Sequence, residues 1–167
     1  MQQSQPQVLY TPEQRAKRDA SRWTLVQGVL APIQFLIFLV SLYLVVYSLQ
    51  TGEYTDWALF SVVLKTLVLY AIMITGCIWE KVVFGKYLFA HAFFWEDVVS
   101  MCVMALHTAY LWVWWEGSWS ASDQLWLALT AYMTYGINAA QYIRKLRMAR
   151  LQKPQSNMVN TTAQVSA

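Results

Sequence analysis

Four apolar runs restrict the fold of this chain more than any other feature. They extend approximately over residues 24–49, 57–79, 92–115 and 123–143. Each is long enough to cross a hydrocarbon core about 30 Å thick, which takes roughly 20 helical residues. Lipid cannot satisfy exposed backbone polar groups, and the runs show no period-two alternation, so helices are expected rather than barrel strands. The sequence therefore predicts an all-α polytopic membrane protein with four transmembrane helices.

The basic residues predict how these helices are oriented. Lysine and arginine occur before the first run, between the second and third, and after the fourth, whereas the other two connections, TGEYTD and EGSWSASD, carry only acids. The positive-inside rule then places both termini and the middle connection in the cytoplasm. A net charge of +3 is explained by this topology and not by nucleic-acid binding. The basic rim would favour anionic lipid or an acidic amphiphile.

Three regions follow from these patterns. Residues 1–22 form a cytoplasmic segment with a short interfacial helix, whose start is indicated by the capping pattern Thr11-Pro12-Glu13-Gln14. Residues 23–150 form the four-helix membrane domain, and residues 151–167 form a polar cytoplasmic tail expected to be disordered. Small residues permit close packing within the bundle or between protomers of a homo-oligomer. These are Gly28, Gly76, Gly136, Ala139 and Ala140.

Some ionisable side chains within or directly next to the second and third apolar runs are candidate functional residues, because burying them in a membrane is expensive. They are Lys65, Glu80, Glu96, Asp97 and His107. At 100° per residue, Lys65 and Glu80 fall within about 60° of one another, and Glu96 and His107 within about 20°. Antiparallel packing of the second and third helices would bring Glu80 near Glu96 and Asp97 at the cytoplasmic end. His107 would lie deeper, and Lys65 deeper still.

Clustered carboxyl groups in a weakly polar setting allow an acid and a base to coexist at neutral pH. The chain has no Ser-His-Asp set, cysteine nucleophile or metal-ligand motif. Acid–base chemistry without a bound cofactor is the enzyme class that remains. Other interpretations stay open: Glu80 and Lys81 as an interfacial pair in an aromatic belt, His107 as a hydrogen-bonded core histidine, Lys65 bonded to a carbonyl or helix-end carboxylate, and His91 as an interfacial residue.

Several segments resemble the vinyl bacteriochlorophyllide hydratase family of photosynthetic bacteria, over approximately residues 9–150. The most specific are IWEKVVFGKYLFA and FFWEDV, with ALHTAY and LYTPEQRAKRDASRW in support. The resemblance implies a hydro-lyase of the bacterial cytoplasmic, photosynthetic membrane. Its reaction would add water across the C3 vinyl group of a chlorophyllide or bacteriochlorophyllide during bacteriochlorophyll synthesis. It also implies that no separate cofactor is needed, because magnesium enters only within the substrate macrocycle.

With this substrate, the residues take on hypothetical roles. Glu96 or Glu80 would be the general acid, Asp97 the base, and His107 a second base or an axial ligand to the substrate's magnesium. Arg22, Lys81 and Lys86 would pair with the substrate carboxylate, and Trp79, Phe94 and Trp95 would offer faces to the macrocycle. Lys65 and His91 complete the residues expected near the substrate. Contact with other pigment-biosynthesis enzymes is a further expectation.

Two other classes of function remain. A pigment carrier or assembly protein would bind the same chlorin without changing it, and it predicts the same aromatic pocket. A small drug/proton antiporter would be expected to carry its working carboxylate in the first helix, and that run contains no acid. A purely structural membrane subunit would leave the matching polar stripes unexplained.

Overall fold

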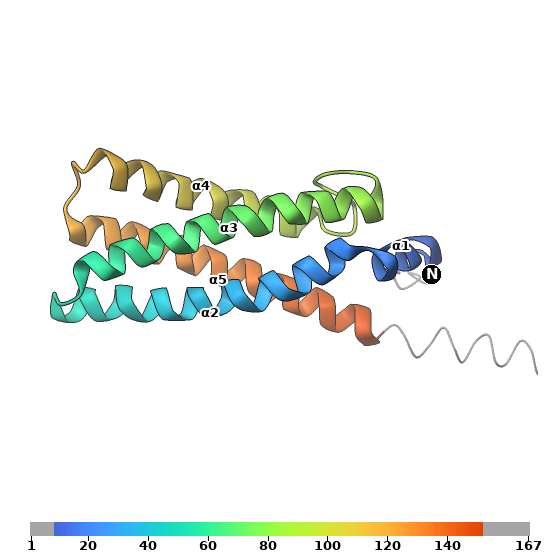
Figure 1. Ribbon diagram of the computed structural model, residues 1–167, viewed down its shortest axis with the longest axis horizontal. Coiled ribbons are helices and arrows are strands. Elements are labelled where there is room, and N and C mark those ends of the chain that lie inside the picture. Colours follow the sequence, from blue (N-terminus) through green and yellow to red (C-terminus); the bar gives the residue numbers. More distant parts are fainter. Residues whose placement is uncertain (1–8, 152–167) are drawn as a thin grey trace, which may run out of the picture.

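Five helices make up the part of the chain that the computed structural model describes, residues 9–151. They are α1 Pro12–Ala20, α2 Arg22–Thr51, α3 Thr55–Phe84, α4 Phe94–Glu116 and α5 Ala121–Leu151. The four long helices run alongside one another as an elongated bundle (Figure 1). The predicted all-α class is therefore confirmed. The predicted disordered tail lies outside the described residues, apart from Leu151 at its start.

Three of the helices, α2, α3 and α4, are long and apolar enough to cross a membrane. Helix α5 has 31 residues but a more polar composition, because its last turns are rich in arginine and lysine. Large apolar side chains are exposed along the outside of the bundle, as in Leu25 at 71% and Trp112 at 71%. Such an apolar exterior suits a lipid environment. The protein is therefore a membrane protein.

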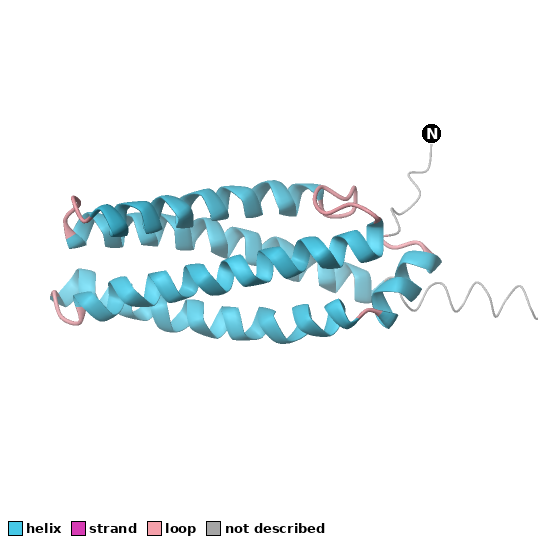
Figure 2. Cartoon of the chain, turned by 45° about the horizontal axis from the view of Figure 1, so that its top comes forward, coloured by secondary structure: helices cyan, strands magenta, loops and turns pink. Residues whose placement is uncertain are grey.

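The connections between the helices divide between the two ends of the bundle. The α2–α3 and α4–α5 connections lie at one end, and α1, the α3–α4 connection and the last turns of α5 lie at the other (Figures 1 and 2). Helix α3 ends at Gly85, whose φ of 81° is left-handed and favours a residue without a side chain. Because α1, the α3–α4 connection and the last turns of α5 lie together, the basic segments of the sequence are gathered at one end of the bundle. We call it the basic end.

Helix α1 begins as the capping pattern predicts. The Thr11 hydroxyl accepts from the Gln14 backbone N–H at 3.2 Å, and the Gln14 side chain accepts from the Thr11 N–H at 3.0 Å. Ser21 ends α1 and caps α2, where its hydroxyl accepts from the Trp23 N–H. The chain therefore turns at Ser21, and α1 packs beside α3 at the basic end.

The interior of the bundle contains polar as well as apolar side chains. Helices α2 and α3 form one closely packed pair and α4 and α5 another. An apolar cluster that includes Phe38, Val62 and Tyr110 fills much of the space between them. Among these apolar side chains lie buried polar ones: Gln34, Ser41, Lys65, Thr66, Ser100, His107 and Asn138. Helices in lipid gain from such interior polar contacts, because the outside offers no partners.

Candidate functional site

Two of the three predicted acids meet at the basic end. Glu80 lies in the last turns of α3 and Asp97 in the first turn of α4; both are buried, and their carboxyl groups interact directly. Asp97 is held in place because its Oδ2 accepts a hydrogen bond of 2.8 Å from the Phe89 N–H. Glu80 Oε2 is buried and has no hydrogen-bond partner among the described residues. We call Glu80 and Asp97 the carboxyl pair.

Glu96, expected to join the same pocket, has a different partner. Its Oε2 lies 2.7 Å from Lys145 Nζ, which reaches across from α5. Lys145 Nζ also lies 5.0 Å from the centre of the Phe93 ring. Glu96 therefore lies near the carboxyl pair and acts electrostatically on Asp97, but its hydrogen-bond partner is Lys145. The Glu96 side chain is about 100° around the helix from that of Asp97, so the two face different neighbours.

Helix α5 contributes residues to the site that sequence reasoning missed. Tyr142 interacts with Asp97 and with Ser100. Its ring stacks on that of Phe93, with 6.1 Å between the ring centres. Asn138 Nδ2 donates to Ser100 Oγ at 2.8 Å. Asn138, Tyr142 and Lys145 are spaced four and three residues apart, which places them on one face of α5. The sequence shows this spacing, but it does not show that these three residues face α4.

The aromatic residues expected to bind the macrocycle differ in how they are placed. Trp79 is not an open face: its Nε1 donates to Thr24 Oγ1 at 2.9 Å, and its ring packs edge-on against Phe84 and Phe93. Phe94 and Trp95, in contrast, are 42% and 69% exposed. Both precede the acids of α4 by one to three residues. Open aromatic surface is therefore present beside the carboxyl pair at Phe94 and Trp95.

The basic residues expected near the substrate lie on the surface of the basic end. Arg22 begins α2, Lys81 lies in the last turn of α3, and Lys86 and His91 lie in the α3–α4 connection. All four are exposed. Lys81 Nζ donates to the Gly85 carbonyl at 3.0 Å, so it also helps to close α3. These four residues are thus exposed at the same end of the bundle as the carboxyl pair.

His107 and Lys65 lie in the bundle interior, both fully buried. His107 Nδ1 is 2.8 Å from the Val103 carbonyl, and Nε2 has no partner among the described residues. Lys65 Nζ lies 3.8 Å from the centre of the Tyr135 ring, and Gln34 is its polar neighbour. His107 is ten residues beyond Asp97, or about 15 Å along the helix. These two residues share the predicted stripes with the acids but do not reach them.

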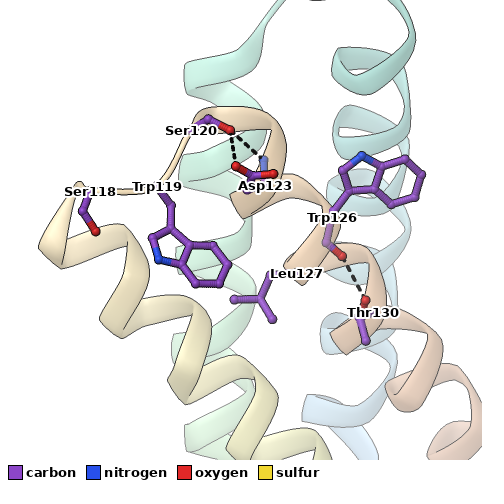
Figure 3. Close-up of a pocket in the computed structure, with 7 residues that line it drawn as sticks. All are labelled: Ser118, Trp119, Ser120, Asp123, Trp126, Leu127 and Thr130. Carbon is purple, nitrogen blue, oxygen red and sulfur yellow. Dashed lines mark hydrogen bonds between the residues drawn. The ribbon is translucent and has the colours of Figure 1, made fainter.

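A hollow at the opposite end of the bundle is unsuited to acid–base chemistry. It has a volume of about 630 Å³ and is lined by residues of the α4–α5 connection and the start of α5, including Trp119, Asp123 and Trp126 (Figure 3). Its acid, Asp123, accepts from the Ser120 hydroxyl at 2.6 Å as part of a helix cap. The hollow is distant from the carboxyl pair, which remains the candidate site.

Comparison with known proteins identifies the family. The family model for 2-vinyl bacteriochlorophyllide hydratase matches residues 10–148. The chain belongs to this family. A 2-vinyl bacteriochlorophyllide hydratase from Cereibacter sphaeroides is 63% identical over 143 residues, which cover 86% of this chain and 89% of the relative. One from Rhodobacter capsulatus is 62% identical over 145 residues, covering 87% and 84%.

Membership in the 2-vinyl bacteriochlorophyllide hydratase family makes this protein a hydro-lyase of bacteriochlorophyll biosynthesis. The matched region contains every site residue described above. No solved structure matches the chain.

Proposed function

We propose that the protein adds water across the C3 vinyl group of a chlorophyllide or bacteriochlorophyllide and gives the 3-(1-hydroxyethyl) derivative. Two relatives carry the name 2-vinyl bacteriochlorophyllide hydratase. The observation that carries the proposal is the interaction between Glu80 and Asp97, two buried carboxyl groups at the end of a membrane bundle. Hydration of a conjugated vinyl group needs one acid and one base, which such a pair supplies.

Glu80 acts as the acid and Asp97 as the base. Glu80 donates a proton to the terminal vinyl carbon, which leaves a positive charge at the inner carbon, delocalised over the macrocycle. The Asp97 carboxylate stabilises this charge. Water then forms a C–O bond at the inner carbon and releases a proton to Asp97. Because the two carboxyl groups interact with one another, that proton returns to Glu80 and closes the cycle.

The different contacts of the two glutamates support this choice of acid. Glu96 Oε2 is engaged in an ion pair with Lys145 Nζ at 2.7 Å, so it is directed at α5 and not at Glu80. Glu80 forms no ion pair among the described residues, and the charged group that acts on its carboxyl group is Asp97. His107 is too deep in the bundle to serve as the base in this scheme, or as a ligand to the substrate's magnesium.

The substrate lies at the lipid-facing surface of the basic end. The flat macrocycle packs on Phe94 and Trp95, and its carboxylate pairs with an exposed cation such as Lys86. The macrocycle thereby stays at lipid depth while its carboxylate reaches the headgroup region. Magnesium participates only as a part of the macrocycle, and the protein holds no further cofactor for the reaction.

In the membrane, α5 forms the fourth span and the basic end faces the cytoplasm. An even number of spans returns both termini to the same side, and the positive-inside rule assigns that side. The chemistry then takes place in the cytoplasmic leaflet of the bacterial membrane, where an anionic surface also attracts the basic rim. Phe94 and Trp95 take interfacial positions typical of aromatic residues.

The test uses membranes that contain the protein, incubated with chlorophyllide a and with a bacteriochlorophyllide, and analysed by mass spectrometry for the gain of one water. Glu80→Gln and Asp97→Asn keep the shape of each side chain but remove its ability to exchange a proton. Each should lower the rate about 100- to 10,000-fold. Asp123→Asn, a matched change at the far end, should leave the rate unchanged.

Two results would contradict the proposal. Full activity in both Glu80→Gln and Asp97→Asn would move the chemistry away from the carboxyl pair. Pigment that co-purifies with the wild-type protein but never gains water would favour a carrier.

A further inference from the structure

A buried amide oxygen without a partner lies next to the proposed site. Asn138 on α5 is 7% exposed, and its Oδ1 has no hydrogen-bond partner among the described residues. The amide is not free to turn, because Nδ2 donates to the buried Ser100 Oγ at 2.8 Å. Buried polar atoms nearly always have a partner, and ordered water commonly supplies it. The fixed oxygen is therefore suited to accept a hydrogen bond from water.

The surrounding residues connect this oxygen to the carboxyl pair. Ser100 lies three residues after Asp97, on the same face of α4. Tyr142 lies four residues after Asn138 on α5 and interacts with both Asp97 and Ser100. Glu80 Oε2 is a second buried acceptor without a partner among the described residues, and it belongs to the residue in contact with Asp97. The polar groups of α4 and α5 thus form a continuous set on the bundle side of the pair.

We propose that Asn138, held by Ser100, binds the water molecule that adds to the vinyl group. This inference rests on the proposed function. The water donates one hydrogen to Asn138 Oδ1 and the other to the Asp97 carboxylate, and an oxygen lone pair faces the inner carbon of the protonated substrate. When the C–O bond forms, the O–H bond directed at Asp97 breaks and its proton passes to that carboxylate. Ser100 is a positioning residue, because it acts through Asn138.

Protonation of the vinyl group and addition of water are two steps that an assay of product alone does not distinguish. Protonation of the terminal carbon by Glu80 turns the vinyl CH2 into a methyl group. If water does not add, loss of a proton from this methyl group restores the vinyl group. In heavy water the restored vinyl group carries deuterium at its terminal carbon. Deuterium exchange without hydration therefore reports protonation alone, and hydration reports protonation followed by water addition.

The chain offers a matched control on the same helix. Gln124 is also a buried amide, 6% exposed, and its Oε1 also has no partner among the described residues. Its Nε2 donates to the Trp119 carbonyl at 3.1 Å, as Asn138 donates to Ser100. It lies about 21 Å from Asn138 along α5, at the opposite end of the bundle. A general effect of losing a buried amide would therefore appear equally in both positions.

The experiment compares wild type, Asn138→Leu, Ser100→Ala and Gln124→Leu in membranes suspended in heavy water. Each sample is assayed for hydrated product and for deuterium in the unreacted vinyl group. Asn138→Leu should lower hydration about 100-fold, as expected when a reacting group loses its position, while exchange persists or rises. Ser100→Ala should show the same change to a smaller degree. Gln124→Leu should match wild type in both measurements.

Hydration at the wild-type rate in Asn138→Leu would overturn the proposal. The proposal would also be overturned if, in both Asn138→Leu and Ser100→Ala, exchange fell by the same factor as hydration. If Asn138→Leu does not accumulate in membranes, Ser100→Ala decides the question by the same two measurements. A failure of the proposed function looks different: the wild-type protein itself would then show neither hydration nor exchange, or both would survive in Glu80→Gln.

Discussion

Lys145 on α5 and Glu96 on α4 form an ion pair, with 2.7 Å between Nζ and Oε2 and side chains only 21% and 10% exposed. The pair fastens the last turns of α5 to the first turn of α4. Glu96 is followed directly in the chain by Asp97, so the ion pair lies next to the carboxyl pair. The geometry of the carboxyl pair therefore depends on a helix that contributes neither of its two acids.

Removing Lys145 should destabilise the bundle. Lys145→Met leaves the Glu96 carboxylate buried without its cation, which costs about 3 kcal/mol of unfolding free energy. The double variant Glu96→Lys with Lys145→Glu restores an ion pair and should recover part of this loss. Thermal unfolding in detergent measures both. Lys17→Met, which breaks the exposed pair with Glu13, is the control and should cause no measurable change. Equal stability of Lys145→Met and wild type would contradict the prediction.

Lys65 should not contribute to substrate binding. Its side chain is fully buried, and it lies about 22 Å along α3 from Glu80. Lys65→Met keeps the length of the side chain and removes its amine, so KM for the pigment should stay within about twofold, since no contact that binds substrate is lost. A rise of KM by tenfold or more, with the protein still folded, would place the pigment inside the bundle instead of at its end.

Cysteine labelling should reveal the orientation of the bundle. In a variant with Cys77 and Cys102 replaced by serine, a membrane-impermeant thiol reagent should label Ser118→Cys from the outside of intact spheroplasts. Lys86→Cys should react only in inverted vesicles, because the basic end is expected in the cytoplasm. Ser118 lies in the α4–α5 connection and Lys86 in the α3–α4 connection. These two connections are at opposite ends of the bundle, so each position serves as the control for the other (Figure 1). Labelling of both from one side would rule out this orientation.

Alkaline pH should loosen α1 from the bundle. Burial raises the pKa of Tyr10 above its ordinary value of 10.0, and the nearby Arg18 only partly opposes this. The folded protein therefore holds the Tyr10 proton more tightly than the unfolded chain does. The resulting stability is complete below about pH 10 and is lost as the pH rises through the folded value. Proteolysis of α1 across this range measures the effect. Tyr10→Phe should remove the pH dependence of Tyr10 but keep its packing against Phe84.

Much of the fold could be predicted because lipid imposes long helices on apolar runs. The predicted first run began at residue 24 and the observed helix begins at Arg22; for the third run the values are 92 and Phe94. The contact of Glu80 with Asp97 was also predictable, because neighbouring antiparallel helices bring the two ends of one connection together. Both predictions rest on interactions that are local in the sequence.

The remaining contacts of the site join residues that are far apart in the sequence, so they could not be predicted from it. Helical periodicity shows that Asn138, Tyr142 and Lys145 share a face, but it does not show which helix that face meets. Trp79 illustrates a second limit: its type suggests a surface for a pigment, whereas its hydrogen bond to Thr24 commits it to the packing of α2 on α3. Partners far apart in sequence decide such cases, and only the packed bundle shows them.

The two acids of the carboxyl pair lie on α3 and α4, which are consecutive in the chain and form one helical hairpin. Chains are made from the N-terminus, so α3 and α4 leave the ribosome before α5. Glu80 and Asp97 can therefore meet while the rest of the chain is still being translated. Until α5 arrives, the nascent hairpin lacks both Lys145 and Tyr142, and Glu96 has no counter-charge. Helix α5, synthesised after α3 and α4, thus completes a centre whose two acids are already in place.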